Sequence, residues 1–563
     1  MSYPRFRVAG EGLTSEKICG KLAIEMQLTT FPLAVLSFLV PAVLVPLSAR
    51  AQTPAQTDGG PVKTMSLSEC IRSALERNLS IQVGDQVDFG KSSGAEPDVA
   101  NLSLHSGGRL AVQGAEVDVH RAYGYYDPFF TTTVGQNFDA TPGGFDPQTG
   151  QTRGDRSIWQ EHFLTDLSGA LPTGGKYDLT ASGARITGTR VDNNTFTRVN
   201  VGHQYRGDAA ISLTQPLLKN AWIDAGRLLI KLSKKDLKIT ELAFQTLVQD
   251  VLRRVALAYF ELLAAREQVK VQTKALELAQ QLLAENKKKV EVGTLAPLDE
   301  KQAESQAAKA RADVTAAVYQ AQLAENLLKS LITHDFGEVQ STTIDPSDRL
   351  IAVYQSFSLP ESWRQGLENR PDYLQAKAAV ERQKLVLLYR RNQIYPSLDL
   401  SATYGRNGIG TTTHRYLESI DENDYAKYGG GITLSFPLSF RNERDSLKKS
   451  KIDAETLVLS LKRREDLVKK DIDDALKGVY ASYATTQATH DSRVYAEAAL
   501  EAEQKKLENG KSTSFNVLQF QRDLTDAASK EIKALSDYNK SLHQLYFNTG
   551  TTLERNKVTL DLK

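Results

Sequence analysis

The stretch that decides the fold is residues 248–290, VQDVLRRVALAYFELLAAREQVKVQTKALELAQQLLAENKKKV. An aliphatic residue recurs at every seventh position of this stretch: Val248, Val255, Leu262, Val269, Leu276, Leu283 and Val290. From Ala221 to Glu291 there is no proline and a single glycine, Gly226, so the sequence predicts one helix of about 105 Å. A sustained seven-residue repeat indicates a supercoiled helix that packs lengthwise on its neighbours, not a helix of a globular domain.

The chain contains two copies of one plan. Leu213-Thr-Gln-Pro-Leu217 reappears as Leu434-Ser-Phe-Pro-Leu438, and Val290-x-x-Gly293 reappears as Leu507-x-x-Gly510. We therefore expect repeat 1 over residues 66–333 and repeat 2 over residues 361–548. The other expected parts are a polar segment at 52–65, long helices at 219–291 and 297–332 in repeat 1 and at 441–509 and 514–547 in repeat 2, a linker at 334–360 and a tail at 549–563.

Each repeat also contains short segments with a period of two. Residues 397–405 and 429–437 alternate apolar and polar side chains, and residues 129–138 and 205–215 do so more weakly. Segments of about ten residues with one apolar and one polar face are typical of strands in outer-membrane barrels. A proline marks each expected strand–helix junction, where its missing N–H is tolerated: Pro128, Pro216, Pro396 and Pro437.

Four strands from one chain do not close a barrel, and an open sheet in lipid leaves unpaired edges. The sequence therefore predicts an oligomer, and three chains with four strands each would form a twelve-stranded barrel. Repeat 1 has more residues between its two expected strands than repeat 2 has. Within them, Phe163–Leu171 and Tyr177–Arg190 are predicted to form an additional hairpin. This hairpin either projects outside as a plug or receptor surface, or adds two spanning strands per chain and makes eighteen. We assign no function to a second insertion, at residues 84–109.

Residues 1–51 are expected to be a signal peptide. The apolar run Phe31–Leu47 is short for a membrane span and holds three prolines, and Ala49-x-Ala51 is a cleavage pattern, so we expect cleavage after Ala51. A membrane anchor is the alternative interpretation, and Met26 is an alternative start. No later stretch reaches 18 apolar residues, so a membrane would be crossed by strands.

Composition excludes several function classes. The 69 Lys+Arg against 68 Asp+Glu leave a net charge of +1, without the basic excess of nucleic-acid binders. Two cysteines exclude a disulfide framework within one chain. The eight histidines are scattered and lack the spacing of metal ligands, so we expect no metal. The sequence contains no complete catalytic motif, so we also expect no cofactor and no enzymatic activity.

The chain resembles the TolC-like outer membrane efflux protein family over nearly all of its length after residue 51. The resemblance rests on four motifs: Leu213-Thr-Gln-Pro-Leu-Leu218, Leu367-Glu-Asn-Arg-Pro-Asp372, Val292-Gly-Thr-x-x-Pro-Leu-Asp299-x-x-Gln302 and Phe515-Asn-Val-Leu-Gln-Phe-Gln-Arg-Asp-Leu524. It implies an α+β membrane protein: a homotrimeric outer-membrane β-barrel, four strands per chain with six as the alternative, continuous with a long periplasmic α-helical barrel. It also implies an exit duct of a tripartite efflux pump or type I secretion system, which works with an inner-membrane transporter and a periplasmic membrane-fusion adaptor and contacts outer-membrane lipid.

The same resemblance places the helix turns at the periplasmic tips, where the adaptor docks. The residues it assigns to adaptor contact are Val292, Gly293, Thr294, Asn509, Gly510 and Lys511. In the best-known members two rings of aspartates narrow the entrance, and the matching positions here are Asn516 and Gln519. The acidic rings are therefore not reproduced, and Asp523, further along, is the candidate for one ring. A secreted, structural coiled-coil envelope or adhesin protein without channel activity is the alternative function, because the heptads alone allow it.

Overall fold

The structure is a computed structural model that describes residues 61–84, 108–148, 150–152, 155–191, 198–293, 296–422 and 425–559. All of these residues lie in one compact unit, Gly59–Lys563. The expected signal peptide with Ala51 lies outside the described residues, as do Thr294 and most of the 84–109 insertion.

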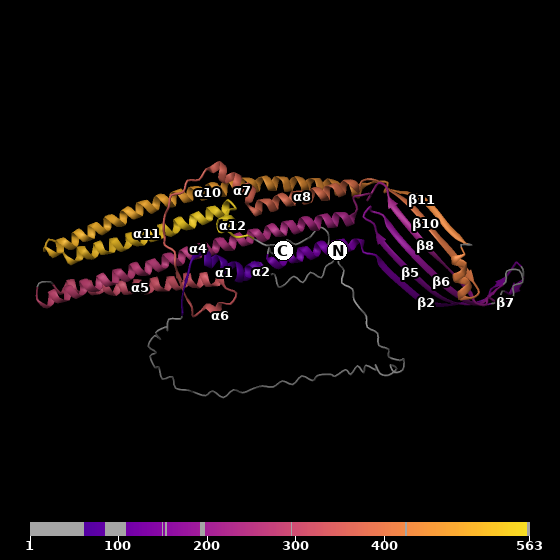
Figure 1. The fold of residues 1–563 in the computed structure, drawn as a ribbon, viewed down its shortest axis with the longest axis horizontal. Coiled ribbons are helices and arrows are strands. Elements are labelled where there is room, and N and C mark those ends of the chain that lie inside the picture. Colours follow the sequence, from indigo (N-terminus) through magenta and orange to yellow (C-terminus); the bar gives the residue numbers. More distant parts are fainter. Residues whose placement is uncertain are drawn as a thin grey trace, which may run out of the picture. The chain divides into compact units, whose positions relative to one another are not determined.

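Two long helical hairpins dominate this unit. The first pairs α4 (Ala225–Glu291) with α5 (Pro297–Ile332), and the second pairs α10 (Arg441–Glu508) with α11 (Ser514–Asn548). The 67 residues of α4 and the 68 of α10 make each about 100 Å long. Two further helices, α3 (Arg109–Tyr123) and α8 (Pro371–Asn392), run beside the sheet-proximal parts of α4 and α10 (Figure 1).

Helix α4 begins at Ala225, six residues later than the expected start at 219. Asn220 and Trp222 adopt positive φ angles of 66° and 60°, which a continuous right-handed helix does not allow. Asp224 then caps the helix, because its carboxylate accepts hydrogen bonds from the backbone N–H groups of Gly226 and Arg227.

The heptad pattern of α4 is buried in one half only. Val248, Val255 and Leu262 are fully buried, whereas the aliphatic heptad positions from Val269 onward are half-buried. Near the tip, the buried positions are instead Ala279, Leu282 and Asn286. The phase of the buried stripe therefore shifts along the helix: α5 and α11 contact α4 in both halves, but only the first half is also covered by the central elements around β1 (Val62–Met65), β9 (Thr343–Pro346) and α1 (Leu67–Arg77).

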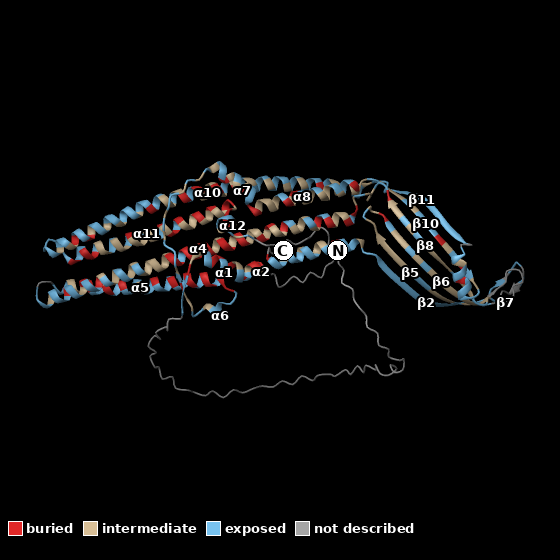
Figure 2. Cartoon of the chain, viewed as in Figure 1, coloured by how far each residue is buried: buried red, intermediate tan, exposed pale blue. Residues whose placement is uncertain are grey.

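Short elements surround the middle of the helices. Strand β1 (Val62–Met65) pairs in parallel with β9 (Thr343–Pro346), so the expected polar segment and linker both contain sheet. The helices here are α1 (Leu67–Arg77), α2 (Leu79–Val83), α6 (Phe336–Val339), α7 (Leu359–Asn369) and α12 (Thr552–Arg555). Tyr259 anchors this region, because its hydroxyl donates to the backbone oxygen of Met65 at 3.2 Å and to Asp348 at 2.7 Å. Figure 2 shows that buried residues concentrate in the helical part and are sparse in the sheet.

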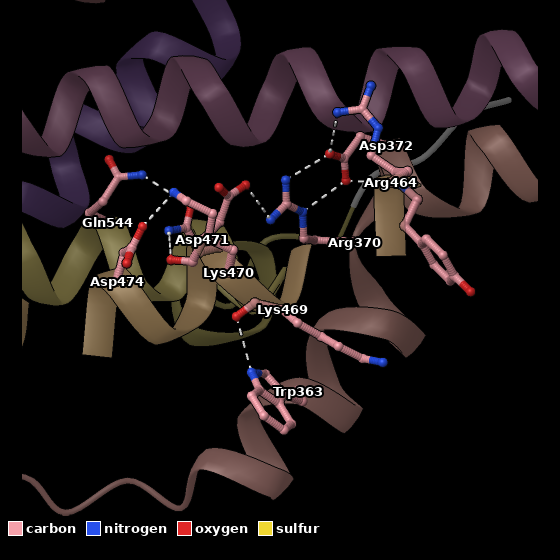
Figure 3. Close-up of polar contacts among 11 residues, drawn as sticks. Trp363, Arg370, Asp372, Arg464, Lys469, Lys470, Asp471, Asp474 and Gln544 are labelled. Atoms are coloured by element: carbon pink, nitrogen blue, oxygen red, sulfur yellow. Dashed lines mark hydrogen bonds and ion pairs between the residues drawn. The ribbon is translucent and has the colours of Figure 1, made fainter. Parts of the chain in front are cut away.

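The Arg-Pro-Asp segment 370–372 joins α7 and α8 to α10 (Figure 3). The guanidinium of Arg370 makes bonds of 2.9 and 2.8 Å to the two carboxylate oxygens of Asp372 and one of 3.3 Å to Asp471. Burial alone would raise the pKa of Asp372, but the hydrogen bonds and charge of Arg370, together with the charge of Arg464, leave it below its usual value. The Trp363 indole N–H also donates to the Lys469 backbone oxygen at 3.1 Å. These contacts hold α7 and the start of α8 against α10.

The large sheet has six long strands in the order β11-β10-β8-β6-β5-β2. They are β2 (Phe129–Thr141), β5 (Arg156–Ala170), β6 (Lys176–Val191), β8 (Gln204–Pro216), β10 (Ser397–Gly410) and β11 (Ala426–Ser435). The expectation of four strands per chain is therefore wrong, and its alternative of six is what the structure has. The accessory elements are η1 (Gly124–Tyr126), β3 (Phe145–Asp146), β4 (Gln151–Thr152), β7 (Arg198–Asn200) and α9 (Thr413–Asp421).

The additional hairpin β5–β6 lies within the sheet, between β2 and β8, and does not project from it. Its turn, residues 171–175, is fixed at the helix end: the Trp222 backbone N–H donates to the Thr173 oxygen at 3.4 Å, and the Thr173 hydroxyl donates to Gln215 at 2.7 Å. Gly174 has a φ of +87° and a Cβ there would lie 2.3 Å from the Asn220 oxygen, so the turn requires glycine. Among the described residues, no helix is long and apolar enough to span a membrane.

Candidate functional site: the sheet faces and the helix tips

The two faces of the six-stranded sheet differ in chemistry. The pairing register places odd-numbered residues of β5, β6 and β8 and even-numbered residues of β2, β10 and β11 on one face, which we call the apolar face. It carries most exposed large hydrophobic side chains of these strands: Phe130, Val134, Phe138, Trp159, Phe163, Leu179, Ile211, Leu213, Leu400, Tyr404, Tyr428, Ile432 and Leu434. The exceptions on the opposite face are Phe129, Leu164 and Ile409. Such a surface matches lipid rather than water.

The opposite face, which we call the polar face, carries charged and hydroxyl side chains that bond across strands. Asp208 accepts from the Ser182 hydroxyl at 2.5 Å and pairs with Lys427 at 3.4 Å. Ser212 and Thr403 are joined at 3.1 Å. The other charged residues with side chains placed on this face include Asp139, Asp166, Lys176, Asp178, Arg206 and Asp399. This face is suited to line an aqueous channel.

Charge appears on the apolar face only at the end far from the long helices. Glu161 pairs there with Arg185 at 2.8 Å, and Arg406 donates to the backbone oxygens of Ile420 and Asp421 at the end of α9. Tyr416 of α9 is buried against the sheet, and its hydroxyl donates to the Ser182 backbone oxygen at 2.7 Å. The apolar surface is thus a band between this polar end and the helix junction.

The junction between sheet and helices holds the four prolines. Pro128 precedes β2, Pro216 ends β8, Pro396 precedes β10 and Pro437 follows β11. Beside them the Tyr126 hydroxyl donates to the Asp224 carboxylate at 3.3 Å, and burial together with that carboxylate raises the pKa of Tyr126 to about 12. The ring of Tyr125 lies so close to Gly226 that a Cβ there would be 2.1 Å from it, which explains the lone glycine of α4.

The two tip turns of the long hairpins are exposed. Val292, the C-cap of α4, is 78% exposed, and Gly293 follows with a φ of +78°. Asn509 is the C-cap of α10, Gly510 has a φ of +69° and Lys511 is exposed. A left-handed glycine at this position ends a helix without strain. Apart from the chain neighbours, no heavy atom of the described residues lies within 4 Å of a Cβ built at either glycine, which agrees with the exposure of both turns.

Asn516, Gln519 and Asp523 lie on one exposed strip at the start of α11, three and four residues apart. The Gln519 amide donates to the Asp523 carboxylate at 3.2 Å. Their spacing places them on successive turns of one helix face.

Sequence reasoning missed the polar contacts that join the two tips. Asn286, with no exposed surface, accepts a hydrogen bond from the Ser514 hydroxyl at 3.1 Å and so links α4 to α11. Further along, the Arg522 guanidinium donates to Gln306 of α5 at 2.9 Å. Leu282, Leu500, Val517 and Leu518 pack beside the Asn286 contact. An asparagine inside a heptad stripe was the available signal, because such residues fix register between helices.

Among the described residues, no group of three or more His, Cys, Asp or Glu side chains could hold a metal ion. The candidate site is instead a set of surfaces: an apolar band, a polar face behind it and two exposed helix tips. This combination defines the class of α+β membrane proteins whose sheet joins long helical hairpins.

Comparison with known proteins identifies the family. Residues 180–334 and 363–551 match the outer membrane efflux protein family, and the chain belongs to it. It is 25% identical over 194 residues to the cobalt-zinc-cadmium resistance protein CzcC of Cupriavidus metallidurans, which covers 34% of this chain and 42% of that protein. It is 23% identical over 358 residues to the outer membrane protein TolC of Vibrio cholerae, covering 62% of this chain and 77% of that protein.

The fold agrees with this assignment. The crystal structure of the Campylobacter jejuni CmeC outer membrane channel superposes with a TM-score of 0.58, covering 91% of this chain and 94% of that chain at 14% identity. At that identity the likeness speaks for the fold alone. Family and fold together favour the outer-membrane interpretation over a secreted coiled-coil protein.

Proposed function

We propose that this protein is the outer-membrane exit duct of a tripartite efflux pump or type I secretion system. The observation that carries the proposal is the sheet with one apolar and one polar face, connected through short junction segments to helices of about 100 Å. The apolar band would contact outer-membrane lipid, the polar face would line the pore and the helices would cross the periplasm. We assign the chain no catalytic step.

The duct would be a homotrimer. In the described residues, the edge strands β2 and β11 each have a neighbour on one side only. Unpaired strand edges in a membrane are too costly to persist, so copies of the chain must supply the missing partners.

The tips would be the periplasmic entrance and the docking site of a membrane-fusion adaptor. We assign adaptor contact to Val292, Gly293, Thr294, Asn509, Gly510 and Lys511, and the lining of the entrance to Asn516, Gln519 and Asp523. Exposure of the described members of both sets supports these roles. An inner-membrane transporter would deliver the cargo and supply the energy.

The first test is envelope fractionation followed by measurement of the mass of the detergent-extracted particle. A chain that begins near Gln52, in the outer membrane, at three times the subunit mass is the expected result. A monomeric particle in the periplasm or outside the cell would refute the duct.

Adaptor docking is tested by cysteine cross-linking to the adaptor encoded with the system. Lys511→Cys at the tip is expected to cross-link, whereas Tyr495→Cys, 73% exposed on the same helix hairpin but away from the turn, is the matched control. Equal cross-linking at both positions would show that the tip is not the docking site.

The name of the Cupriavidus relative makes divalent cobalt, zinc and cadmium the first cargo to test. Loss of the gene should then sensitise cells to these ions, and unchanged sensitivity would direct the search to other cargo.

A further inference from the structure

The hairpin β5–β6 is built into the sheet along most of its length. Strand β5 pairs with β2 from Phe129↔Ser168 to Thr141↔Arg156, and β6 pairs with β8 from Lys176↔Thr214 to Ile186↔Gln204. In repeat 2 the corresponding strands β10 and β11 pair directly with each other. Repeat 1 therefore contributes four long strands and repeat 2 contributes two.

The hairpin also continues both faces of the sheet. Phe163 and Leu179 extend the apolar face, and Asp166 and Asp178 extend the polar face. A loop that left the membrane would not need this division, since water would surround both of its sides. A hairpin that spans the membrane does need it.

The two edges of the sheet are suited to pair with each other between copies. Strand β2 leads away from the helices and β11 returns toward them, so β2 of one copy meets β11 of the next in antiparallel orientation, as an even-stranded barrel requires. The residues of β11 are all exposed, as are nearly all those of β2, which leaves both edges open to a partner.

We propose that the trimer forms an eighteen-stranded outer-membrane pore, in which the β5–β6 hairpin of each copy supplies two of the strands. This inference rests on the proposed function, since it needs three copies in the membrane. It deepens that function by setting the size of cargo that the membrane part admits.

The width follows from strand geometry. With about 4.8 Å between strands and a tilt of about 40°, twelve strands enclose a backbone diameter of about 24 Å and eighteen strands about 36 Å. Inward side chains take roughly 5 Å on each side, which leaves about 14 Å or about 26 Å of free width. One α-helix is about 10 Å across, so the wider pore admits a helical hairpin or a partly folded chain, and the narrower one does not.

The test uses paired cysteines in the full chain in its outer membrane. Thr132→Cys with Thr165→Cys joins β2 to β5, where the native hydroxyls are 3.1 Å apart, and Ser182→Cys with Asp208→Cys joins β6 to β8. Ser212→Cys with Thr403→Cys, between β8 and β10, is the control that both topologies allow. Cys70 stays in place because it has no exposed surface.

All three pairs are expected to form intramolecular disulfides to a similar extent. The barrel end of the purified trimer should also measure about 36 Å between opposite backbone walls in averaged electron micrographs. A cross-linked control pair with reduced hairpin pairs, or a barrel of about 24 Å, would overturn the eighteen-stranded pore and leave the duct intact. A particle that is not a trimer, or is not in the outer membrane, would refute the duct itself.

Discussion

Removing Arg370 should destabilise the protein far more than removing a neighbouring arginine with as many ion-pair partners. The side chain of Arg370 is 10% exposed and bonds to Asp372 and Asp471, whose side chains are 20% and 40% exposed. Arg364, on α7, bonds to Glu361 at 2.6 Å and Glu368 at 2.8 Å, but its side chain is 58% exposed. The two residues thus separate burial from the number of ion pairs.

The magnitude follows from what Arg370→Ala leaves behind. The carboxylate of Asp372 keeps only Arg464, at 3.8 Å, as an ion-pair partner. Breaking a fully buried ion pair by removing one partner costs about 3–5 kcal/mol, because a charge remains without compensation. Water reaches part of both aspartates here, so we expect a loss of about 2–3 kcal/mol in the free energy of unfolding per chain. Arg364→Ala should change stability little, since exposed ion pairs contribute little.

The assay is urea unfolding of the detergent-extracted particle, followed by the helical circular dichroism signal. Arg370→Ala should lower the midpoint clearly, while Arg364→Ala should leave it near that of the parent. Combining Arg370→Ala with Asp372→Asn should cost less than the sum of the two single variants, because the double variant removes the orphaned charge. Equal midpoints for the Arg370 and Arg364 variants would refute the view that burial makes the Arg370 ion pairs contribute more to stability than the exposed ion pairs of Arg364.

Three further outcomes are expected. Leu179→Arg on the apolar face should reduce the yield of outer-membrane particle, at a cost of about 2 kcal/mol, whereas Thr180→Arg on the polar face should not; equal yields would contradict the assignment of the faces. Burial lowers the pKa of His543 to about 4, so the folded chain resists the protonation that the unfolded chain accepts at about 6.5. The free energy of unfolding should therefore fall by about 2–3 kcal/mol as pH drops from 6.5 to 4. Urea unfolding at several pH values measures this dependence, and the His543→Gln variant should not show it. Asn286→Leu leaves the buried Ser514 hydroxyl without its acceptor and should cost about 1–2 kcal/mol, measured by the same unfolding; an unchanged midpoint would show that this tip contact contributes nothing.

The sequence carried enough information to predict the strands and the tip turns that form the candidate surfaces, but not the contacts within them. Gly293 and Gly510 are found at turns because a long helix can reverse only where its periodic pattern stops. The Asn286–Ser514 contact could not be predicted from the sequence, because it joins residues far apart in the chain and depends on which faces of the two helices meet. The same holds for the Arg370 cluster: the Arg-Pro-Asp motif is visible in the sequence, but its partner Asp471 on α10 is not.

The long helices and the two-faced strands could be predicted from the sequence alone, through its local periodicity. A seven-residue repeat without proline specifies a long supercoiled helix, and a two-residue alternation specifies a strand with unlike faces, because both depend only on neighbours along the chain. The position of the β5–β6 hairpin depended on the tertiary structure. Its alternation predicts two strands with unlike faces but not their neighbours, and pairing with β2 and β8, together with the fixed turn at residues 171–175, places the hairpin inside the sheet. Strand pairing is a contact between distant segments, so only the folded chain decides that the sheet has six long strands.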